Sequence, residues 1–192
     1  MNKNQKQAEP VQPDTAPVKS TTNRRIEYVK QQKSQQLNNW LPLKIEMAHH
    51  WIEHEKTQMK RNMTRGAVHF CHFGENIGCE QNEERPVVIV SNNTVNSTSG
   101  NVLVVPLTKN LKIRTIPKTG QAVLTKDGKP IPRFQSHYFL FKSKYDFLAF
   151  DSAAKTEETT SVSKVRLKEH LGNLDEEDVS RLENRLKWSF GI

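Results

Sequence analysis

Short apolar runs, none longer than eight residues, follow one another through the C-terminal two-thirds of this chain. Turn residues separate them, which is typical of β-strands. The runs cover residues 66–73, 86–91, 101–107, 121–125, 137–141 and 151–156. Asp127-Gly128 is a hairpin signal directly after the fourth run. Many short strands followed by one terminal helix predict a mainly β fold, a small and strongly bent β-barrel.

The final segment has helical spacing instead. Its apolar residues form one stripe: Leu174, Val179, Leu182, Leu186 and Phe190. Four acidic residues open the segment, and basic residues lie toward its end, which suits the helix macrodipole. The pattern predicts a closing helix over residues 175–188.

The N-terminal third differs in composition. Residues 1–65 hold 12 Lys and Arg against 6 Asp and Glu, whereas residues 66–192 hold 17 against 15. Apolar residues make up only 34% of the chain, and the mean hydropathy is −0.75, so part of the chain is expected to stay unpacked. We divide the chain into a disordered basic tail (1–22), a helical extension (23–63) and a folded domain (64–192).

The extension carries two sets of apolar residues at helical spacing. Ile45, Ile52 and Met59 recur at intervals of seven, and Leu43, Met47 and Trp51 at intervals of four. Pro42 is expected to break this segment into two helices or to start the second one. Two interpretations stay open: the helices pack on the domain, or they form a basic arm for a polyanion or a partner protein.

Compartment signals are few. The two cysteines, Cys71 and Cys79, imply no disulfide framework, so a reducing compartment is expected. No apolar run approaches 18 residues, and no signal peptide is recognisable. We expect a soluble cytoplasmic protein that does not contact a membrane.

One polar stretch stands directly before a buried strand. Residues 78–85 read Gly-Cys-Glu-Gln-Asn-Glu-Glu-Arg, and Pro86 then starts an apolar run that ends at Ser91-Asn92-Asn93. So many charges and amides at a strand end indicate a loop that binds something.

These residues carry a family resemblance. Three stretches resemble toxins of the MazF/PemK family: Gly66-Ala67-Val68, the stretch from Gly78 to Arg85-Pro86, and the run 102–107 that ends in Thr108. Residues 151–167 resemble the last strand of these toxins and the start of their closing helix. The similarity covers about residues 65–192. It implies an SH3-like barrel that forms a homodimer and pairs with a cognate antitoxin protein.

The resemblance also implies a reaction. Such toxins cut single-stranded RNA at short sequences without a metal or other cofactor and leave a 2′,3′-cyclic phosphate and a 5′-hydroxyl. Arg85 and Thr108 match the family's two catalytic positions, and Glu80 and Gln81 match the pair in its first loop. Cys79 stands where the family usually has serine.

The chemistry of these side chains can be worked out independently. Cleaving RNA through its 2′-hydroxyl needs a proton acceptor, a donor to the leaving oxygen and positive charge on the transition state. Arg85 offers rigid donors suited to phosphate, and Thr108 offers a hydroxyl. Since guanidinium groups stay protonated, we expect Arg85 to stabilise charge and Glu80 to accept the proton or to orient Arg85. The alternative is that Glu80, Glu83, Glu84 and Arg85 form surface ion pairs only.

Further residues are candidates for holding RNA. Gln81 and Cys79 lie in the first loop, and Lys109, Lys112 and Arg114 form a basic track after Thr108. An added hairpin over residues 118–135 lies beside this track and is expected to influence which sequence is read. Aromatic residues nearby are candidates for stacking on bases or for the core: Phe134, Tyr138 and Phe139.

The histidines give weaker patterns. His50 and His54 are spaced for a shared metal on a helix, but no third ligand is evident, so we expect no metal site. His69 and His72 point to opposite faces of a strand, which disfavours an acid–base pair. His137 opens a strand, where a structural role is the more common one.

Two rival functions stay open. The chain ends in Trp188-Ser189-Phe190-Gly191-Ile192, which is similar to the tail of CcdB-like gyrase poisons of the same barrel fold. The other rival function is that of a non-catalytic barrel that binds nucleic acid, including DNA in a regulatory role. The N-terminal extension has no counterpart in a minimal toxin, and it is open whether it covers the site, extends the RNA surface or binds the antitoxin.

Overall fold

The computed structural model describes residues 21–192, so most of the predicted tail (1–22) lies outside the described residues. The chain divides into two compact units, Met1–Asn39 and Trp40–Ile192. Helix α1 (Thr21–Lys60) begins in the first unit and ends in the second. The second unit also contains β1 (Ala67–Gly74), β2 (Glu83–Ile89), α2 (Asn93–Thr98), β3 (Asn101–Thr108), β4 (His137–Leu140), β5 (Ser152–Lys155), η1 (Thr156–Glu158), β6 (Thr160–Ser163), η2 (Lys164–Arg166), β7 (Leu167–Asn173) and α3 (Glu176–Phe190).

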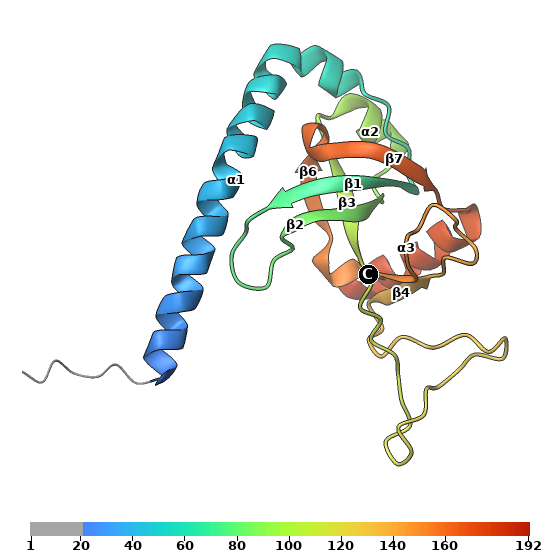
Figure 1. The fold of residues 1–192 in the computed structure, drawn as a ribbon. Helices are drawn as coiled ribbons and strands as arrows, with labels where there is room; N and C mark the ends of the chain where they lie inside the picture. The colour runs from blue at the N-terminus through green and yellow to red at the C-terminus, as the bar shows by residue number, and fades with distance from the viewer. Residues whose placement is uncertain (1–20) are drawn as a thin grey trace, which may run out of the picture. The chain divides into compact units, whose positions relative to one another are not determined.

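An antiparallel sheet organises the second unit (Figure 1). The strand order is β4-β5-β3-β2-β1-β7, and β6 also pairs with β3. The predicted mainly β fold class is therefore confirmed. The sheet is not closed, because the strand path ends at β4 on one side and at β7 on the other.

The sheet has a hydrophobic cluster on each face. Val88 and Val105 belong to the cluster beneath α3, with Leu182 and Leu186 of that helix. Val87 and Ile89 belong to the cluster on the opposite face, with Cys71 and Phe73 of β1. Neighbouring residues of β2 thus face opposite sides, as the two-residue period of a strand requires. Both sides of the central strands are buried, which explains their nearly continuous valine runs.

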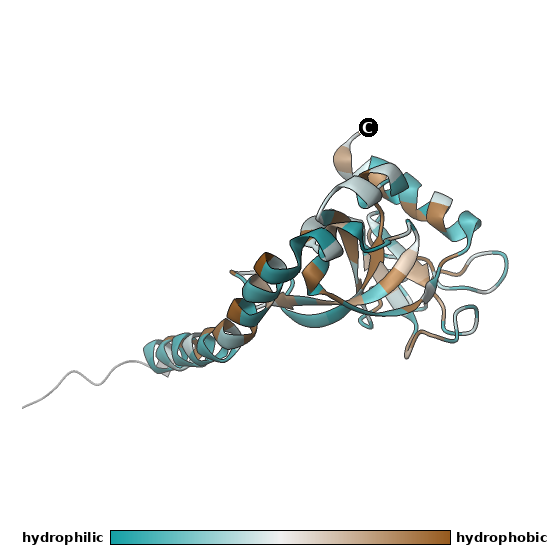
Figure 2. Ribbon diagram, turned by 90° about the horizontal axis from the view of Figure 1, so that it is seen from above, coloured by the Kyte–Doolittle hydropathy of each residue, from teal (hydrophilic) through white to brown (hydrophobic). Residues whose placement is uncertain are grey.

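Helix α3 confirms the predicted closing helix. Asp175 is its N-cap and accepts a hydrogen bond from the Asp178 backbone, and Gly191 ends it with a φ of 72°. Apolar and polar residues alternate along the helix (Figure 2), and the buried residues include Leu182 and Leu186. The predicted stripe ends early, since Phe190 is 58% exposed.

The prediction that Pro42 breaks the extension is wrong. Pro42 lies inside α1, and the residue with non-helical backbone angles is His54, at φ −124° and ψ 22°. A proline lacks one hydrogen-bond donor but keeps helical φ, so a long helix can absorb it with a local bend. Of the predicted apolar sets, Leu43, Met47 and Trp51 are half-buried, whereas Ile45 and Ile52 are exposed. Within residues 21–192, no helix has the length and hydrophobicity to cross a bilayer.

The predicted strand over residues 121–125 is also wrong. The β3–β4 insert, residues 109–136, contains three isolated bridges instead: Ile113 with Pro132, Thr115 with Ala122, and Leu124 with Pro130. Prolines in the insert cannot donate to a ladder, so pairing does not extend. The Asp127-Gly128 turn is present, with the Gly128 amide donating to the Thr125 carbonyl at 3.0 Å and a Gly128 φ of 75°.

The structure adds β6 and β7, which the apolar runs did not predict. The start of a closing helix was expected near residue 167, but η2 is a single turn and Leu167 opens β7. Strand β7 reads LKEHLGN and buries only its first residue fully. An edge strand this polar gives no apolar run to recognise.

Candidate active site

The loop between β1 and β2, residues 75–82, is held in shape by two asparagines. The Asn76 amide Nδ2 donates to the Gln81 carbonyl at 2.7 Å, and the Asn76 backbone donates to Asn82 Oδ1 at 2.6 Å. Gly78 adopts a φ of 65°, which a residue with a side chain rarely takes. The loop is therefore an ordered platform that presents the side chains of residues 79–81.

Cys79 and Glu80 are both exposed on this platform. One Glu80 carboxylate oxygen accepts a hydrogen bond from the Ile77 backbone at 3.1 Å. Among residues 21–192, no cation forms an ion pair with Glu80, so its charge is not neutralised within the described chain. The expected contact between Glu80 and Arg85 is not present in this structure.

Gln81 points across to the segment that follows β5. Its Nε2 donates to the Glu158 carboxylate, whose other oxygen accepts from Lys155 Nζ. Glu158 belongs to η1, a single turn that lies between β5 and β6. Both of these strands pair with β3. This turn places Glu158 within reach of the loop.

Arg85 and Thr108 occupy matching positions on neighbouring strands. Val87 pairs with Pro106, and Ile89 with Val104, in antiparallel register. Continuing that register by two residues places Arg85 opposite Thr108, with both side chains on one face of the sheet. Arg85 Nε donates to the Asn82 carbonyl at 2.8 Å, and Thr108 Oγ1 accepts from the Asn110 backbone at 3.2 Å.

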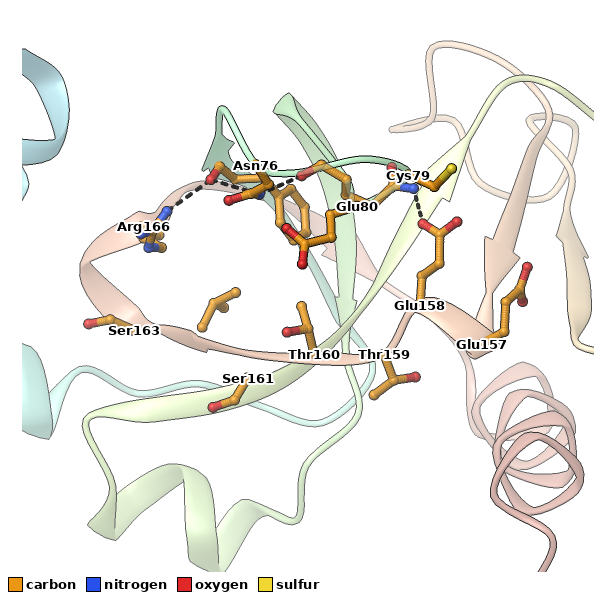
Figure 3. Close-up of a pocket in the computed structure, with 13 residues that line it drawn as sticks. Asn76, Cys79, Glu80, Glu157, Glu158, Thr159, Thr160, Ser161, Ser163 and Arg166 are labelled. Atoms are coloured by element: carbon orange, nitrogen blue, oxygen red, sulfur yellow. Dashed lines mark hydrogen bonds between the residues drawn. The ribbon is translucent and has the colours of Figure 1, made fainter. Parts of the chain in front are cut away.

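A cleft of about 640 Å³ opens between the loop and β6 (Figure 3). Glu80 and Asn76 lie along one side of it, Thr160, Ser161 and Ser163 along the other, and Arg166 at one end. Phe73 and Val162 line the cleft and also belong to the hydrophobic cluster that contains Val87. The cleft therefore opens on the face of the sheet that Arg85 and Thr108 share, although neither residue lines it.

The basic track lies at the start of the β3–β4 insert. Lys109, Lys112 and Arg114 are exposed, and Lys109 Nζ lies 5.7 Å from the ring centre of Phe150. The insert holds five lysines and two arginines against one aspartate, a net charge of +6, whereas the rest of residues 66–192 carries a net charge of −4. Such a charge concentration on an exposed segment favours contact with a polyanion.

The aromatic candidates divide between surface and core. Phe134 is 46% exposed, with the Arg133 guanidinium 5.6 Å from its ring centre. Phe139 is buried in the sheet, and Tyr138 donates to Asp178 at 2.6 Å. Only Phe134 of the three presents a ring that an incoming base can reach.

Several cleft residues gave no signal in the sequence. Glu157, Glu158 and Arg166 come from short polar segments without a recognisable motif. Burial alone would raise the pKa of Glu157, but hydrogen bonds from its own backbone, Ser136 and His137 outweigh burial and lower it. His137 is buried and its Nε2 lies 2.9 Å from Glu157, in line with a structural role.

The remaining histidine and cysteine candidates do not assemble into a site. His69 is buried, and burial lowers its pKa. Burial also raises the pKa of Cys71 to about 12, so this thiol stays protonated. His50 and His54 stack with ring centres 4.4 Å apart. Across residues 21–192, no three His, Cys, Asp or Glu side chains are grouped as metal ligands.

The fold and the cleft define a class of protein: a small antiparallel β-domain with a C-terminal helix and a polar cleft beneath its first loop. The sequence identifies the family. Residues 64–190 match the sequence model of the PemK-like, MazF-like toxins of type II toxin–antitoxin systems. This match spans more than half of the chain, so the chain belongs to that family, which confirms the resemblance found in the sequence.

Individual relatives agree with this assignment. The chain is 31% identical to Endoribonuclease MazF of Staphylococcus saprophyticus over 130 residues, covering 68% of this chain and 92% of that protein. It is 31% identical over 128 residues to Endoribonuclease MazF of Staphylococcus epidermidis, covering 67% and 91%. The crystal structure of MazF from Deinococcus radiodurans superposes with a TM-score of 0.51 at 16% identity, covering 68% of this chain and 97% of that one, which supports the fold alone.

Proposed function

We propose that this toxin is an endoribonuclease that cuts single-stranded RNA at a short sequence, with the RNA's own 2′-hydroxyl as nucleophile and no metal ion. The products are a 2′,3′-cyclic phosphate and a 5′-hydroxyl. One observation carries the proposal: in a chain of the MazF-like family, β2 and β3 pair at Val87 and Pro106, so that Arg85 and Thr108 each lie two residues beyond this pair, on the face that carries the polar cleft.

Arg85 and Thr108 are the proposed groups at the phosphate. The Arg85 guanidinium offers donors in a fixed plane that suits two phosphate oxygens and stabilises the charge of the transition state. Its Nε is held by the Asn82 carbonyl, which leaves the two terminal nitrogens for the phosphate. The Thr108 hydroxyl accepts one backbone hydrogen bond and still has its own proton to donate.

Glu80 is the proposed proton acceptor. Its carboxylate is exposed, and within the described chain it is bound only by the Ile77 backbone. A carboxylate without a cationic partner keeps its capacity to accept a proton from a bound 2′-hydroxyl. Gln81 and Cys79 contact the RNA from the same loop, and Lys109, Lys112 and Arg114 hold its phosphates along the insert.

The proposed partners follow from the family. A toxin of a type II system is inhibited by a cognate antitoxin protein, and we propose that this chain acts as a homodimer on cytoplasmic RNA. The alternatives are less well supported. The exposed Trp188 and Ile192 would suit a gyrase-directed tail, but the family match and both MazF relatives favour RNA cleavage.

The test is cleavage of a long single-stranded RNA by the full chain in the presence of EDTA. We expect discrete cuts, and we expect Arg85→Ala to reduce the rate by about 100-fold or more while RNA binding persists. Arg181→Ala, which removes an exposed arginine paired with Glu177 on α3, is the matched control and retains full rate. RNA binding without cuts would instead support a non-catalytic barrel. Inhibition of gyrase without cuts would support a gyrase poison.

A further inference from the structure

The C-terminal part of α1, Trp40–Lys60, lies outside the residues that match the toxin family, yet it packs on the matched domain. Two half-buried tryptophans make this contact, and each covers a glycine of the domain. Trp51 covers Gly100, directly before β3, whereas Trp40 covers Gly74, the last residue of β1. Of these two glycines, only Gly74 adjoins the loop that carries Cys79, Glu80 and Gln81.

The contact at Gly74 leaves no room for a side chain. Gly74 has a φ of 81°, and a Cβ built there would overlap the indole ring of Trp40. The register between β1 and β2 shifts between His72 and Gly74, and Gly74 forms the last pair of the ladder, with Glu83. Trp40 therefore packs on the residue where the strand ends and the loop begins.

Arg166 joins Trp40 to the same strand end. Its guanidinium centre lies 5.9 Å from the Trp40 ring centre, in cation–π geometry. Its Nη1 donates to the carbonyls of His72 and Phe73 at 3.0 and 3.1 Å. Arg166 also lines the cleft, so the indole ring supports a side chain that is itself part of the cleft wall.

A second set of contacts runs from Trp40 toward Arg85. The rings of Trp40 and His72 are 6.2 Å apart, and His72 Nδ1 lies 3.2 Å from the Glu84 carboxylate. Lys168 Nζ lies 3.0 Å from the same carboxylate. Glu84 directly precedes Arg85 in β2 and contacts His72, which in turn contacts Trp40. Gly74, which also contacts Trp40, directly precedes the loop.

We propose that Trp40 is a positioning residue for the active site: through Gly74, Arg166 and His72, the N-terminal helix fixes the loop that presents Glu80. The helical extension is then a working part of the toxin and not a passive addition. This inference rests on the proposed RNA cleavage for its catalytic consequence, but its structural content stands apart from that activity.

The first test compares three full-length variants in RNA cleavage under EDTA. We expect Trp40→Ala to lower kcat about tenfold with little change in KM, because a displaced Glu80 affects the transition state more than binding. Trp40→Phe keeps a ring over Gly74 and Arg166 and restores most of the rate. Trp51→Ala is the matched control, because Trp51 is also half-buried and also covers a glycine, and it keeps kcat within about twofold. Equal losses in the two alanine variants would overturn the proposal.

The second test does not depend on cleavage. Hydrogen exchange of the full chain is measured by mass spectrometry for wild type and both alanine variants. Trp40→Ala is expected to speed exchange in residues 74–82, and Trp51→Ala in residues near Gly100. Unchanged exchange over 74–82 in Trp40→Ala overturns the proposal. If wild type makes no cuts, RNA cleavage is refuted, and the exchange result still decides whether Trp40 holds the loop.

Discussion

Glu80 and Arg85 belong to one short stretch, yet they do not touch. Arg85 is bound to the Asn82 carbonyl, and Glu80 to the Ile77 backbone. This separation favours two independent roles over a joint ion pair: Arg85 at the phosphate and Glu80 at the proton. It also argues against the alternative that the charges of this stretch exist to pair with one another.

At this scale the prediction concerns Glu80→Gln. The amide keeps the size and the hydrogen-bonding oxygen of the side chain but cannot take up a proton at neutral pH, so we expect cleavage to slow by about 100-fold or more. Glu83→Gln removes a nearby exposed carboxylate as the control. Single-turnover cleavage with saturating enzyme measures the chemical step. A rate equal to wild type would show that Glu80 is not the acceptor.

Among the elements, α3 is fixed to the sheet by a buried charge. Asp178 is 4% exposed and accepts hydrogen bonds from Tyr138 and Tyr145 at 2.6 Å and from Lys144 at 3.0 Å. Burial alone would raise the pKa of Asp178, but these hydrogen bonds, with the Lys144 charge, outweigh it and lower the pKa. The ionised form is therefore the one that stabilises the folded state.

The consequence is a defined pH dependence. An aspartate whose folded pKa is lowered contributes stability fully above its unfolded pKa of about 3.9 and loses it as pH falls through the folded value. We expect Asp178→Asn to lower the free energy of unfolding by about 2 kcal/mol at pH 7 and to flatten its fall between about pH 5 and pH 2. Glu177→Gln, on the exposed side of α3, is the control. Urea unfolding across that pH range measures the free energy of unfolding. If this free energy changed with pH in parallel for wild type and Asp178→Asn, the account would be contradicted.

The elements also show how far the sequence alone could lead. Residues 87–89 and 104–107 are buried on both faces of the sheet, so their apolar runs were recognisable. The Glu80, Gln81, Arg85 and Thr108 set could be selected because its members match motif positions of the MazF/PemK family. Glu158, Arg166 and β7 gave no comparable signal, since they are polar and are placed by tertiary contacts. The same limit applies to His54, where the bend of α1 occurs instead of at Pro42.

Across the whole molecule, charge is distributed unevenly between scaffold and insert. The β3–β4 insert carries a net charge of +6, counting five lysines and two arginines against Asp127, whereas the rest of residues 66–192 carries a net charge of −4. The cleft contributes the opposite sign, with Glu80, Glu157 and Glu158 against Arg166. We interpret the insert as the surface that attracts the RNA backbone and the cleft as a surface for its less charged parts.

Salt dependence tests this division. Each phosphate contact that is lost should reduce the slope of log binding constant against log salt concentration by about 0.7 for single-stranded RNA. The double variant Lys112→Ser/Arg114→Ser should therefore bind more weakly and show a slope reduced by about 1.4. Lys56→Ser/Lys60→Ser removes the same charge from α1 as the control. Fluorescence anisotropy at several salt concentrations gives the slopes, and an equal reduction in both variants would refute a specific role for the insert.

The most direct test of the central claim uses one RNA with one changed atom. The full chain is first given an oligoribonucleotide that it cuts at a mapped bond, and then the same oligonucleotide with a 2′-deoxy sugar on the 5′ side of that bond. The account predicts that the modified bond stays intact while other cut sites react normally, and that the fragments of the unmodified RNA end in a 2′,3′-cyclic phosphate and a 5′-hydroxyl. Continued cleavage at the 2′-deoxy position would mean that water is the nucleophile, and the mechanism built on Arg85, Thr108 and Glu80 would be wrong.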